Sequence, residues 1–450
     1  MIIETIKTEG LSHLSYLIGS KGAAAVIDPQ RDCETYVERA RARGMQITHI
    51  FETHRNEDFI SGAPILAEIT GAQVWHGPNP AEPVRYADTA REGDSFDIGS
   101  ARISVLETPG HTDDHLAFAL YDTEYDQGAV GVFTGDALFV GDVGRTDFYP
   151  DRAREVSGLL FDSLRKLEQL GDQTIIYPAH GAGSVCGAGM ADREFSTIGH
   201  ERANNPLMQI TDREAFIATK VAENHYKPPY FSTMERLNTE GGSAMPRVAT
   251  PVPLDLAGFR NAGADRVIDT RSVTAFAGAH WPGALCLPVG MITAFAGWFL
   301  KETDRVVLIS DSMEEARAAA THLRRTGFDN VVGAFTKMVG AVANGQAFDS
   351  TPMVDVARVK ARIAEGADDW TLLDVRSIDE VKAYPIEAAR HIYVGHLNEQ
   401  WRDLDPSRAY TVMCASGARA SVAAGWLKAQ GFERVDVFLG SAGAWKADAD

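Results

Sequence analysis

The chain has 450 residues, which exceeds what one ordinary hydrophobic core holds, so two or three domains are expected. A formal net charge of −19 argues against binding to nucleic acid or to an anionic membrane surface. The first residues, MIIETIKTEG, lack the basic and apolar regions of a signal peptide, and no segment approaches the roughly 18 apolar residues of a membrane span. The four cysteines lie far apart, which favours reduced thiols and a cytoplasmic protein over a disulfide framework.

Residues 1–200 alternate short β-rich runs with turns, and the runs end at Gly, Pro or Asp. Helical patterns are predicted over 32–43 and 151–170, and two polar helices over about 192–205 and 212–224. The stretch KPPYF…GGSAMPRVATPVP is rich in Pro and Gly and is predicted to be a linker. The predicted domains are 1–240, 255–345 and 355–450.

Five acidic or imidazole side chains in the first domain each follow a β-run and precede a turn. A single His at a strand end is weak evidence, but a whole series of potential ligands predicts a metal site. The residues are His54 in FETHRNEDFISG, His111 and His115 in TPGHTDDH, Asp136 in FTGDALF and His180 in YPAHGAG.

In order and spacing this series resembles the metallo-β-lactamase superfamily, which implies an αββα sandwich. Within it, GDALFVGDVGRTDF resembles the persulfide dioxygenases, and the glyoxalase II hydrolases are close relatives. The resemblance implies that His54, His111 and Asp136 hold one Fe(II) per chain. It also implies that Arg145 helps to position an anionic thiol-bearing substrate, whereas the alternative is a structural ion pair with Asp142 or Asp147.

The element T-H-x-H-x-D-H of the binuclear hydrolases is altered at two positions, which carry Asn56 and Phe59. An amide is a poor zinc ligand and a phenyl ring has no lone pair, so a second metal position keeps only Asp58 and His180, too few for tight binding. Two imidazoles and one carboxylate suit ferrous iron with open positions for substrate and oxygen. The alternative is a decayed, metal-free scaffold.

The remaining polar groups are candidates for orienting ligands or binding substrate, or for purely structural roles. They are Asp58, His115 and His180. Cys186, in a Gly-rich loop after His180, is either a thiol near the iron or a buried spectator, and Cys33 is treated as incidental.

Beyond residue 260 the chain repeats itself. RVIDTRSVTAF resembles TLLDVRSIDEV, and residues 306–328 resemble residues 410–432 at a constant offset. Alternating strands and helices of this kind predict two small α/β units with parallel sheets.

The second copy carries CASGARAS between a strand and a helix, so backbone N–H groups are expected to face the sulfur of Cys414 and favour its anionic form. With LLDVRS upstream, this loop resembles the rhodanese family, which implies catalytic roles for Cys414 and Arg419 and binding roles for Ser416 and Gly417. The alternative is a structural cysteine. The usual G-H-I-P-G-A element is replaced by AYPIEAARHI, which departs from the family pattern.

The first copy also resembles rhodanese, but Ser310 stands where the second copy has its cysteine, and the loop SDSMEEA is acidic. No sulfur transfer is expected there. Cys286, in ALCLP, is predicted to pack in a buried strand.

The combination resembles persulfide dioxygenase–rhodanese fusions. That resemblance implies oxidation of a low-molecular-weight persulfide by O₂ to sulfite, sulfur transfer that makes or uses thiosulfate, and a homo-oligomer. Two alternatives remain: a glyoxalase II-like thioester hydrolase, and a sulfur carrier with an inactive metal domain. The sequence leaves the thiol open among glutathione, coenzyme A, cysteine and bacterial thiols.

Overall fold

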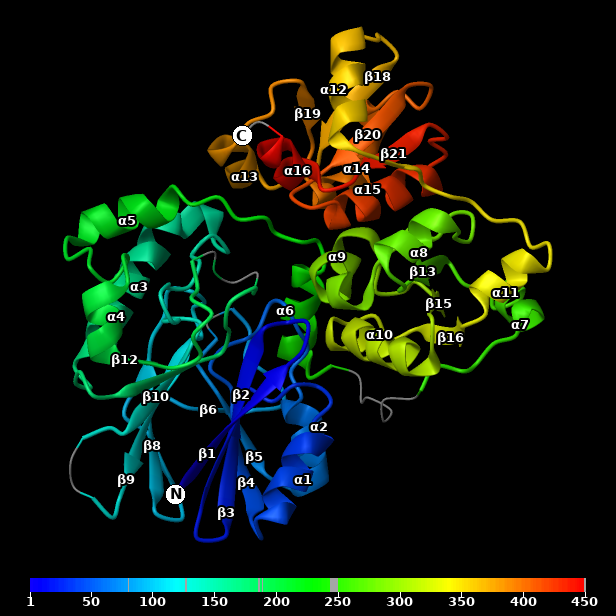
Figure 1. Ribbon diagram of the computed structural model, residues 1–450. Helices are drawn as coiled ribbons and strands as arrows, with labels where there is room; N and C mark the ends of the chain where they lie inside the picture. The colour runs from blue at the N-terminus through cyan, green and yellow to red at the C-terminus, as the bar shows by residue number, and fades with distance from the viewer. Residues whose placement is uncertain (80, 126–127, 185–186, 188, 243–249, 449–450) are drawn as a thin grey trace. The chain divides into compact units, whose positions relative to one another are not determined.

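The computed structural model describes residues 1–450 except 80, 126–127, 185–186, 188, 243–249 and 449–450 (Figure 1). Its contacts divide the chain into two compact units, residues 1–248 with 325–327, and residues 249–324 with 328–450. In the described part of the chain, no helix has both the length and the apolar character needed to span a membrane.

The first unit contains two six-stranded sheets. The strands of the first sheet are, in order, β1 (Ile2–Thr8), β2 (His13–Ser20), β3 (Ala23–Ile27), β4 (Gln46–Phe51), β5 (Gln73–His76) and β6 (Asp88–Thr89). The strands of the second sheet are, in order, β12 (Ser196–Thr197), β11 (Ile175–Pro178), β10 (Gly131–Gly135), β9 (Leu116–Asp122), β8 (Ala101–Glu107) and β7 (Ser95–Ile98).

A shared apolar core joins the facing sides of these two sheets. Tyr16 and Phe51 of the first sheet pack in one cluster with Ile103, Phe118 and Phe133 of the second. Central strands such as β2 and β10 are buried along their whole length, because each lies between the facing sheet and a layer of helices.

Helices cover the outer faces of both sheets (Figure 1). They are α1 (Glu34–Ala42) and α2 (Ala63–Thr70) beside the first sheet, and α3 (Ala153–Glu168), α4 (Ile198–Asn204) and α5 (Arg213–Val221) beside the second, with a 3₁₀ turn at Pro150–Arg152. Helix α3 buries Val156, Leu160, Leu164 and Leu167, an apolar stripe at helical spacing. The predicted αββα sandwich is therefore confirmed.

The linker prediction is wrong over part of its range, because helix α6 spans Phe231–Glu240. The helix buries Phe231 and Met234 and ends at Gly241 in a left-handed conformation. The helix was not predicted because the Pro and Gly residues on both sides of this short amphipathic segment indicated a linker.

The second unit contains two parallel sheets, one for each sequence repeat. The first copy has the order β14 (Leu285–Cys286), β13 (Arg266–Asp269), β15 (Val306–Ile309) and β16 (Val331–Phe335). Its helices are α7 (Leu256–Arg260), α8 (Val273–Gly278), α9 (Ile292–Phe299), α10 (Met313–Arg325) and α11 (Met338–Ala343), with a 3₁₀ turn at Val289–Met291.

The second copy has the order β17 (Met353–Val354), β21 (Val435–Phe438), β20 (Ala409–Met413), β18 (Trp370–Asp374) and β19 (Ala389–His391). Its helices are α12 (Val356–Glu365), α13 (Ile378–Ala383), α14 (Leu397–Gln400), α15 (Ala418–Ala429) and α16 (Ser441–Ala447), with 3₁₀ turns at Val394–His396 and Trp401–Asp403.

The Asp-x-Arg element has the same geometry in both copies. Arg271 donates to Asp269 through Nε and Nη2 at 2.8 and 2.6 Å, and Arg376 donates to Asp374 through Nη2 at 2.6 Å. Both pairs are buried, so the sequence repeat is a structural repeat.

Gly110, in the loop that carries His111, cannot be replaced without strain. It has a φ of +140°, and an added Cβ would lie 2.4 Å from the backbone nitrogen of Leu160. Gly110→Ala should lower the unfolding temperature of the first unit by several degrees, because strain and overlap together exceed roughly 2 kcal/mol. Differential scanning calorimetry measures this.

Gly93→Ala is the matched control, since Gly93 also has a positive φ but has no atom within 4 Å of the added Cβ. Equal losses in the two variants would contradict the role given to the contact with α3.

Candidate metal centre

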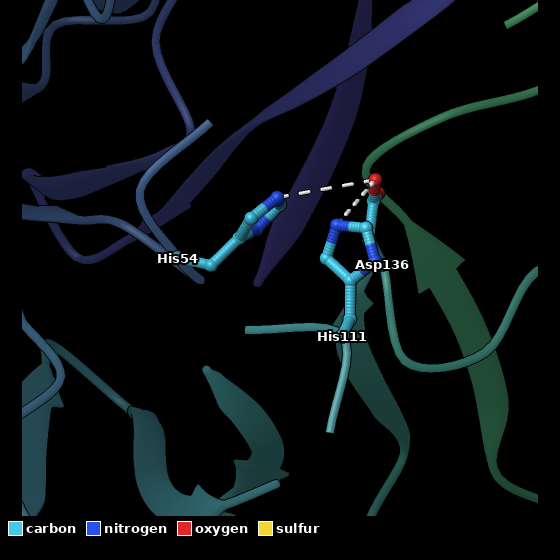
Figure 2. A group of neighbouring side chains, drawn as sticks. All are labelled: His54, His111 and Asp136. Carbon is cyan, nitrogen blue, oxygen red and sulfur yellow. Dashed lines mark ion pairs between the residues drawn. The ribbon is translucent and has the colours of Figure 1, made fainter. Parts of the chain in front are cut away.

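Three side chains from separate loops converge between the two sheets. His54 follows β4, His111 follows β8 and Asp136 follows β10, and all three are buried. Their candidate ligand atoms lie within 4.8 Å of one another, and Figure 2 shows both imidazoles directed at the carboxylate. The structure thus brings together the three residues that the sequence singled out as ligands.

The imidazole of His54 is oriented by a chain of two hydrogen bonds. Thr53 donates its hydroxyl proton to Asp28 Oδ2 at 2.9 Å, so the Thr53 oxygen accepts from His54 Nδ1 at 2.9 Å. This fixes the proton on Nδ1 and leaves the lone pair of Nε2 for an ion. The Nε2 atom of His54 is buried without a hydrogen-bond partner among the described residues, as expected of a metal ligand.

Asp28 anchors this chain from the end of β3. It also accepts the backbone N–H of Thr53 at 2.7 Å, and its own backbone has a φ of +49°. Burial raises the pKa of Asp28 to about 7, although its two bonds to Thr53 act in the opposite direction. Sequence reasoning missed Asp28, for which the only signal was an Asp at a strand end in AAAVIDP.

His111 is held in the equivalent tautomer by the main chain. Its Nδ1 donates to the carbonyl oxygen of Arg145 at 2.9 Å, so Nε2 again faces the centre. Gly144 makes this approach possible, since a Cβ there would lie 2.0 Å from the Asp136 carbonyl and 3.1 Å from His111 Nδ1.

Asp136 is held through both its side chain and its backbone. Its Oδ1 atom is 2.8 Å from His180 Nδ1, and its backbone N–H donates to His115 Nε2 at 3.0 Å. Burial alone would raise the pKa of Asp136, but the imidazoles of His180, His54 and His111 hold it well below its usual range. Burial lowers the pKa of His115 to about 3, which agrees with a neutral ring accepting this N–H.

At the position where a binuclear site holds its second metal ion, the side chains of this protein contact one another. His180 faces Asp136 through Nδ1 and lies 3.2 Å from Asp58 Oδ2 through Nε2, so its ring bridges two carboxylates. The ring of Phe59 packs on that of His13 with centroids 4.1 Å apart. Among the described residues, His54, His111 and Asp136 are the only group of three potential ligands whose ligand atoms all lie within 4.8 Å of one another.

One carboxylate at the centre was missed by sequence reasoning. Glu57 is buried, and its Oε1 and Oε2 atoms lie 3.2 Å from His111 Nε2 and 3.7 Å from His54 Nε2. Helix α6 holds this loop, because Asn238 donates to the carbonyl oxygens of Asn56 and Phe59 at 2.7 and 2.8 Å. Glu57 occupies a variable position of the T-H-x-H-x-D-H element, and Asn238 belongs to no motif, so neither carried a signal.

The side chain of Arg145 makes its contacts with neighbouring side chains of the protein. Its guanidinium donates to both oxygens of Asp147 at 2.6 Å and stacks 4.9 Å from the ring centroid of Phe148. This geometry favours the structural ion pair over a direct substrate contact.

Described residues line two pockets beside the centre. One of about 50 Å³ is bounded by Arg55, Glu57, Thr112, Phe148, Tyr149, Lys227, Phe231 and Glu235. The other, of about 230 Å³, is bounded by Lys7, Ser12, Leu14, Val140, Pro178, His180–Ala182 and Met190–Glu194. Cys186 lies outside the described residues, so its relation to these pockets remains a prediction.

In the second unit, Cys414 follows β20 and precedes α15. The N–H of Gly417, whose φ is +113°, donates to Cys414 Sγ at 3.1 Å. Ser441 was not anticipated, yet its Oγ accepts the N–H of Cys414 at 3.1 Å. Ser416 is an exposed member of the loop that carries Cys414.

Arg419 forms a bidentate pair with Glu380 at 2.6 and 2.7 Å. Burial would raise the pKa of Glu380, but this pairing lowers it to about 2. In the first copy, Ser310 is buried and its hydroxyl contacts that of Thr270 at 2.7 Å.

The fold and the buried cluster at its strand ends define a metallo-β-lactamase-type metal domain, and residues 8–180 match the Metallo-beta-lactamase superfamily. Residues 253–336 and 355–448 match the Rhodanese-like domain. The chain belongs to the metallo-β-lactamase superfamily and carries two rhodanese-like domains after its metal domain.

Known relatives agree with this placement. A hydroxyacylglutathione hydrolase from Methylobacterium sp. (strain 4-46) is 31% identical over 216 residues, which cover 42% of this chain and 80% of the relative. Another from Rhodospirillum rubrum is 35% identical over 160 residues, covering 35% of this chain and only 57% of the relative. A crystal structure of a metallo-beta-lactamase from Staphylococcus aureus subsp. aureus COL has a TM-score of 0.68 and 28% identity, covering 74% of this chain and 98% of that one.

Thr53→Val should weaken metal binding by about 10- to 100-fold, because it removes the hydroxyl that fixes the His54 tautomer. Isothermal titration of the metal-free protein with Co(II) measures the change. Thr53→Ser keeps the hydroxyl and should bind like the unaltered protein, and equal affinity in all three proteins would contradict the role of this hydrogen bond.

Proposed function

We propose that the first unit is a mononuclear Fe(II) persulfide dioxygenase and that the second unit transfers sulfane sulfur through Cys414. The observation that carries this proposal is the cluster of His54, His111 and Asp136 beside a position at which Asn56 and Phe59 replace two imidazoles of the binuclear site. Two imidazoles and one carboxylate with open positions are typical of non-heme Fe(II) oxygenases.

The three residues would hold the ion, which when bound supplies the redox chemistry that couples O₂ reduction to sulfur oxidation. One persulfide, one O₂ and one water give one thiol and one sulfite, with the outer sulfur oxidised and O₂ reduced. Asp28, Thr53 and the Arg145 carbonyl hold the protons of the two imidazoles away from the ion. His115 fixes the backbone of Asp136.

The small pocket beside Glu57 would receive the thiol end of the substrate. Its wall carries two basic side chains, Arg55 and the exposed Lys227, two acidic ones, Glu57 and Glu235, and the apolar rings of Phe148 and Phe231. Arg55 pairs with Glu235, so Lys227 is the cation that would meet an anionic group of the substrate. This lining does not distinguish glutathione from other anionic thiols.

The Cys414 thiolate would attack the outer sulfur of a low-molecular-weight persulfide, break its S–S bond with release of the free thiol, and carry the sulfur as a cysteine persulfide. Attack by sulfite on the outer sulfur then breaks the S–S bond, forms thiosulfate and returns the electron pair to Cys414 as thiolate. The N–H of Gly417 already donates to Sγ, and loop N–H groups at the start of α15 favour an anionic sulfur. The first copy, with Ser310, takes no part.

A thioester hydrolase is the second candidate, because the names of both curated relatives describe hydroxyacylglutathione hydrolases. Such chemistry in this superfamily would use a binuclear centre, which Asn56 and Phe59 disfavour. The third candidate function is that of a sulfur carrier that performs no metal chemistry.

Reconstituted anaerobically with Fe(II), the protein should retain about one iron per chain, as expected of one three-residue site. With glutathione persulfide it should consume O₂ and release sulfite. Asp136→Asn should lose both iron and O₂ uptake, since it removes the anionic ligand, whereas the exposed control His200→Ala should retain both. An oxygen electrode and metal analysis measure these outcomes.

Two zinc ions per chain with hydrolysis of a glutathione thioester would favour the hydrolase. An iron-loaded protein that consumes no O₂ but loads sulfur on Cys414 would favour the carrier.

Cys414→Ser should leave O₂ uptake unchanged and reduce thiosulfate formation from sulfite by at least about 100-fold, because the nucleophile is lost. Ser310→Ala should change neither rate. A Cys414→Ser variant that still makes thiosulfate at the original rate would place sulfur transfer elsewhere. Ion chromatography of sulfite and thiosulfate distinguishes these results.

A further inference from the structure

The two rhodanese-like copies differ in how the residue after the central strand is held. In the first copy, Ser310 follows β15 and donates its N–H directly to the carbonyl oxygen of Phe335, the last residue of β16, at 3.2 Å. In the second copy, Cys414 donates its N–H to Ser441 Oγ at 3.1 Å. The hydroxyl of Ser441 in turn donates to the carbonyl oxygen of Phe438, the last residue of β21, at 2.7 Å. The copy that carries the cysteine therefore has a hydroxyl inserted between these two backbone groups.

Ser441 holds this place in a strained backbone conformation. It has a φ of +48°, in the left-handed region that residues other than glycine rarely adopt, and its side chain is buried. A glycine would adopt this conformation without strain, so the presence of a serine indicates a use for its hydroxyl. Ser441 is the first residue of α16, whereas the corresponding helix of the first copy, α11, begins at Met338, which carries no hydroxyl.

The segment around Ser441 also binds the Cys414 loop through the main chain. Three N–H groups of residues 440–443 donate to three successive carbonyl oxygens of that loop. The pairs, at 3.0, 3.0 and 3.2 Å, are Ala442 to Cys414, Gly443 to Ala415 and Gly440 to Ser416. In a planar trans peptide the C=O and N–H groups point in opposite directions, so these bonds turn the next three N–H groups away from residues 440–443. The third of them, that of Gly417, donates to Cys414 Sγ at 3.1 Å.

We propose that Ser441 is a positioning residue of the sulfur-transfer loop, an inference that rests on the proposed transfer through Cys414. Its hydroxyl holds residues 440–443 against the loop, and those residues keep the N–H of Gly417 directed at the sulfur. When sulfite takes the outer sulfur of the persulfide, the electron pair of the broken S–S bond returns to Cys414 Sγ. The N–H of Gly417 stabilises this developing charge, so Ser441 acts on the rate of transfer and not on the binding of sulfite.

The test is a single-turnover reaction of the full chain under anaerobic conditions, which prevent oxidation of the persulfide. Cys414 is loaded with glutathione persulfide, the excess is removed, and thiosulfate formation is followed over a range of sulfite concentrations, with Cys414→Ser as the background. Ser441→Ala and Ser441→Gly should each lower the rate constant at saturating sulfite at least about tenfold, because both lack the hydroxyl. The amplitude and the half-saturating sulfite concentration should stay within about twofold, whereas partial unfolding would lower the amplitude.

The two variants separate the hydroxyl from the backbone strain. Glycine adopts a positive φ without penalty and alanine does not, so Ser441→Gly should unfold at a higher temperature than Ser441→Ala. Ser407→Ala is the matched control, because Ser407 is exposed and its hydroxyl donates to Asp405 ahead of β20, at the end of the strand remote from Cys414. It should change neither the rate constant nor the amplitude.

Hydrogen–deuterium exchange of residues 414–417 tests the hydrogen bonds of Ser441 without sulfur transfer. Exchange should accelerate at least about tenfold in both Ser441 variants and stay unchanged in Ser407→Ala, because only the former remove the acceptor of the Cys414 N–H. Unchanged exchange, unchanged rate constants, or a rate constant restored in Ser441→Gly would overturn the proposal. The predicted exchange together with an unaltered protein that loads no sulfur on Cys414 would count against the proposed function alone.

Discussion

The metal centre depends on the orientation of two imidazole rings. Each donates its Nδ1 proton to a fixed oxygen, His54 to the hydroxyl of Thr53 and His111 to the carbonyl of Arg145. Only this tautomer turns both Nε2 lone pairs towards Asp136. The fold holds both oxygens in place. Thr53 is hydrogen-bonded to Asp28 at the end of β3, and Arg145 follows Gly144, which packs closely on the Asp136 carbonyl.

The position that a second metal ion occupies in a binuclear site lacks a full set of ligands in this protein. The side chains there make contacts with one another. His180 links the carboxylates of Asp58 and Asp136, and Phe59 packs on His13. The contact with His180 helps to keep Asp136 ionised. The proposed single-ion chemistry therefore follows from packing and hydrogen bonding as much as from the missing imidazoles.

The sequence predicted the sandwich, the structural repeat and the convergence of His54, His111 and Asp136, because strand ends in such a sheet meet along one edge. It missed Asp28, Glu57 and Asn238, whose roles depend on which loops the tertiary fold places together. Helix α6 was hidden between Pro and Gly residues, although Phe231, Met234 and Leu237 have helical spacing. The structural partners of Arg145 and Arg419, which are Asp147 and Glu380, likewise required the folded chain.

The most direct test of the central claim is anomalous diffraction from crystals of the iron-loaded protein, measured at the iron and zinc absorption edges. We predict one peak per chain, at the iron edge, within bonding distance of His54 Nε2, His111 Nε2 and Asp136. A second peak between Asp58 and His180, or a peak not in contact with His54 and His111, would contradict the account.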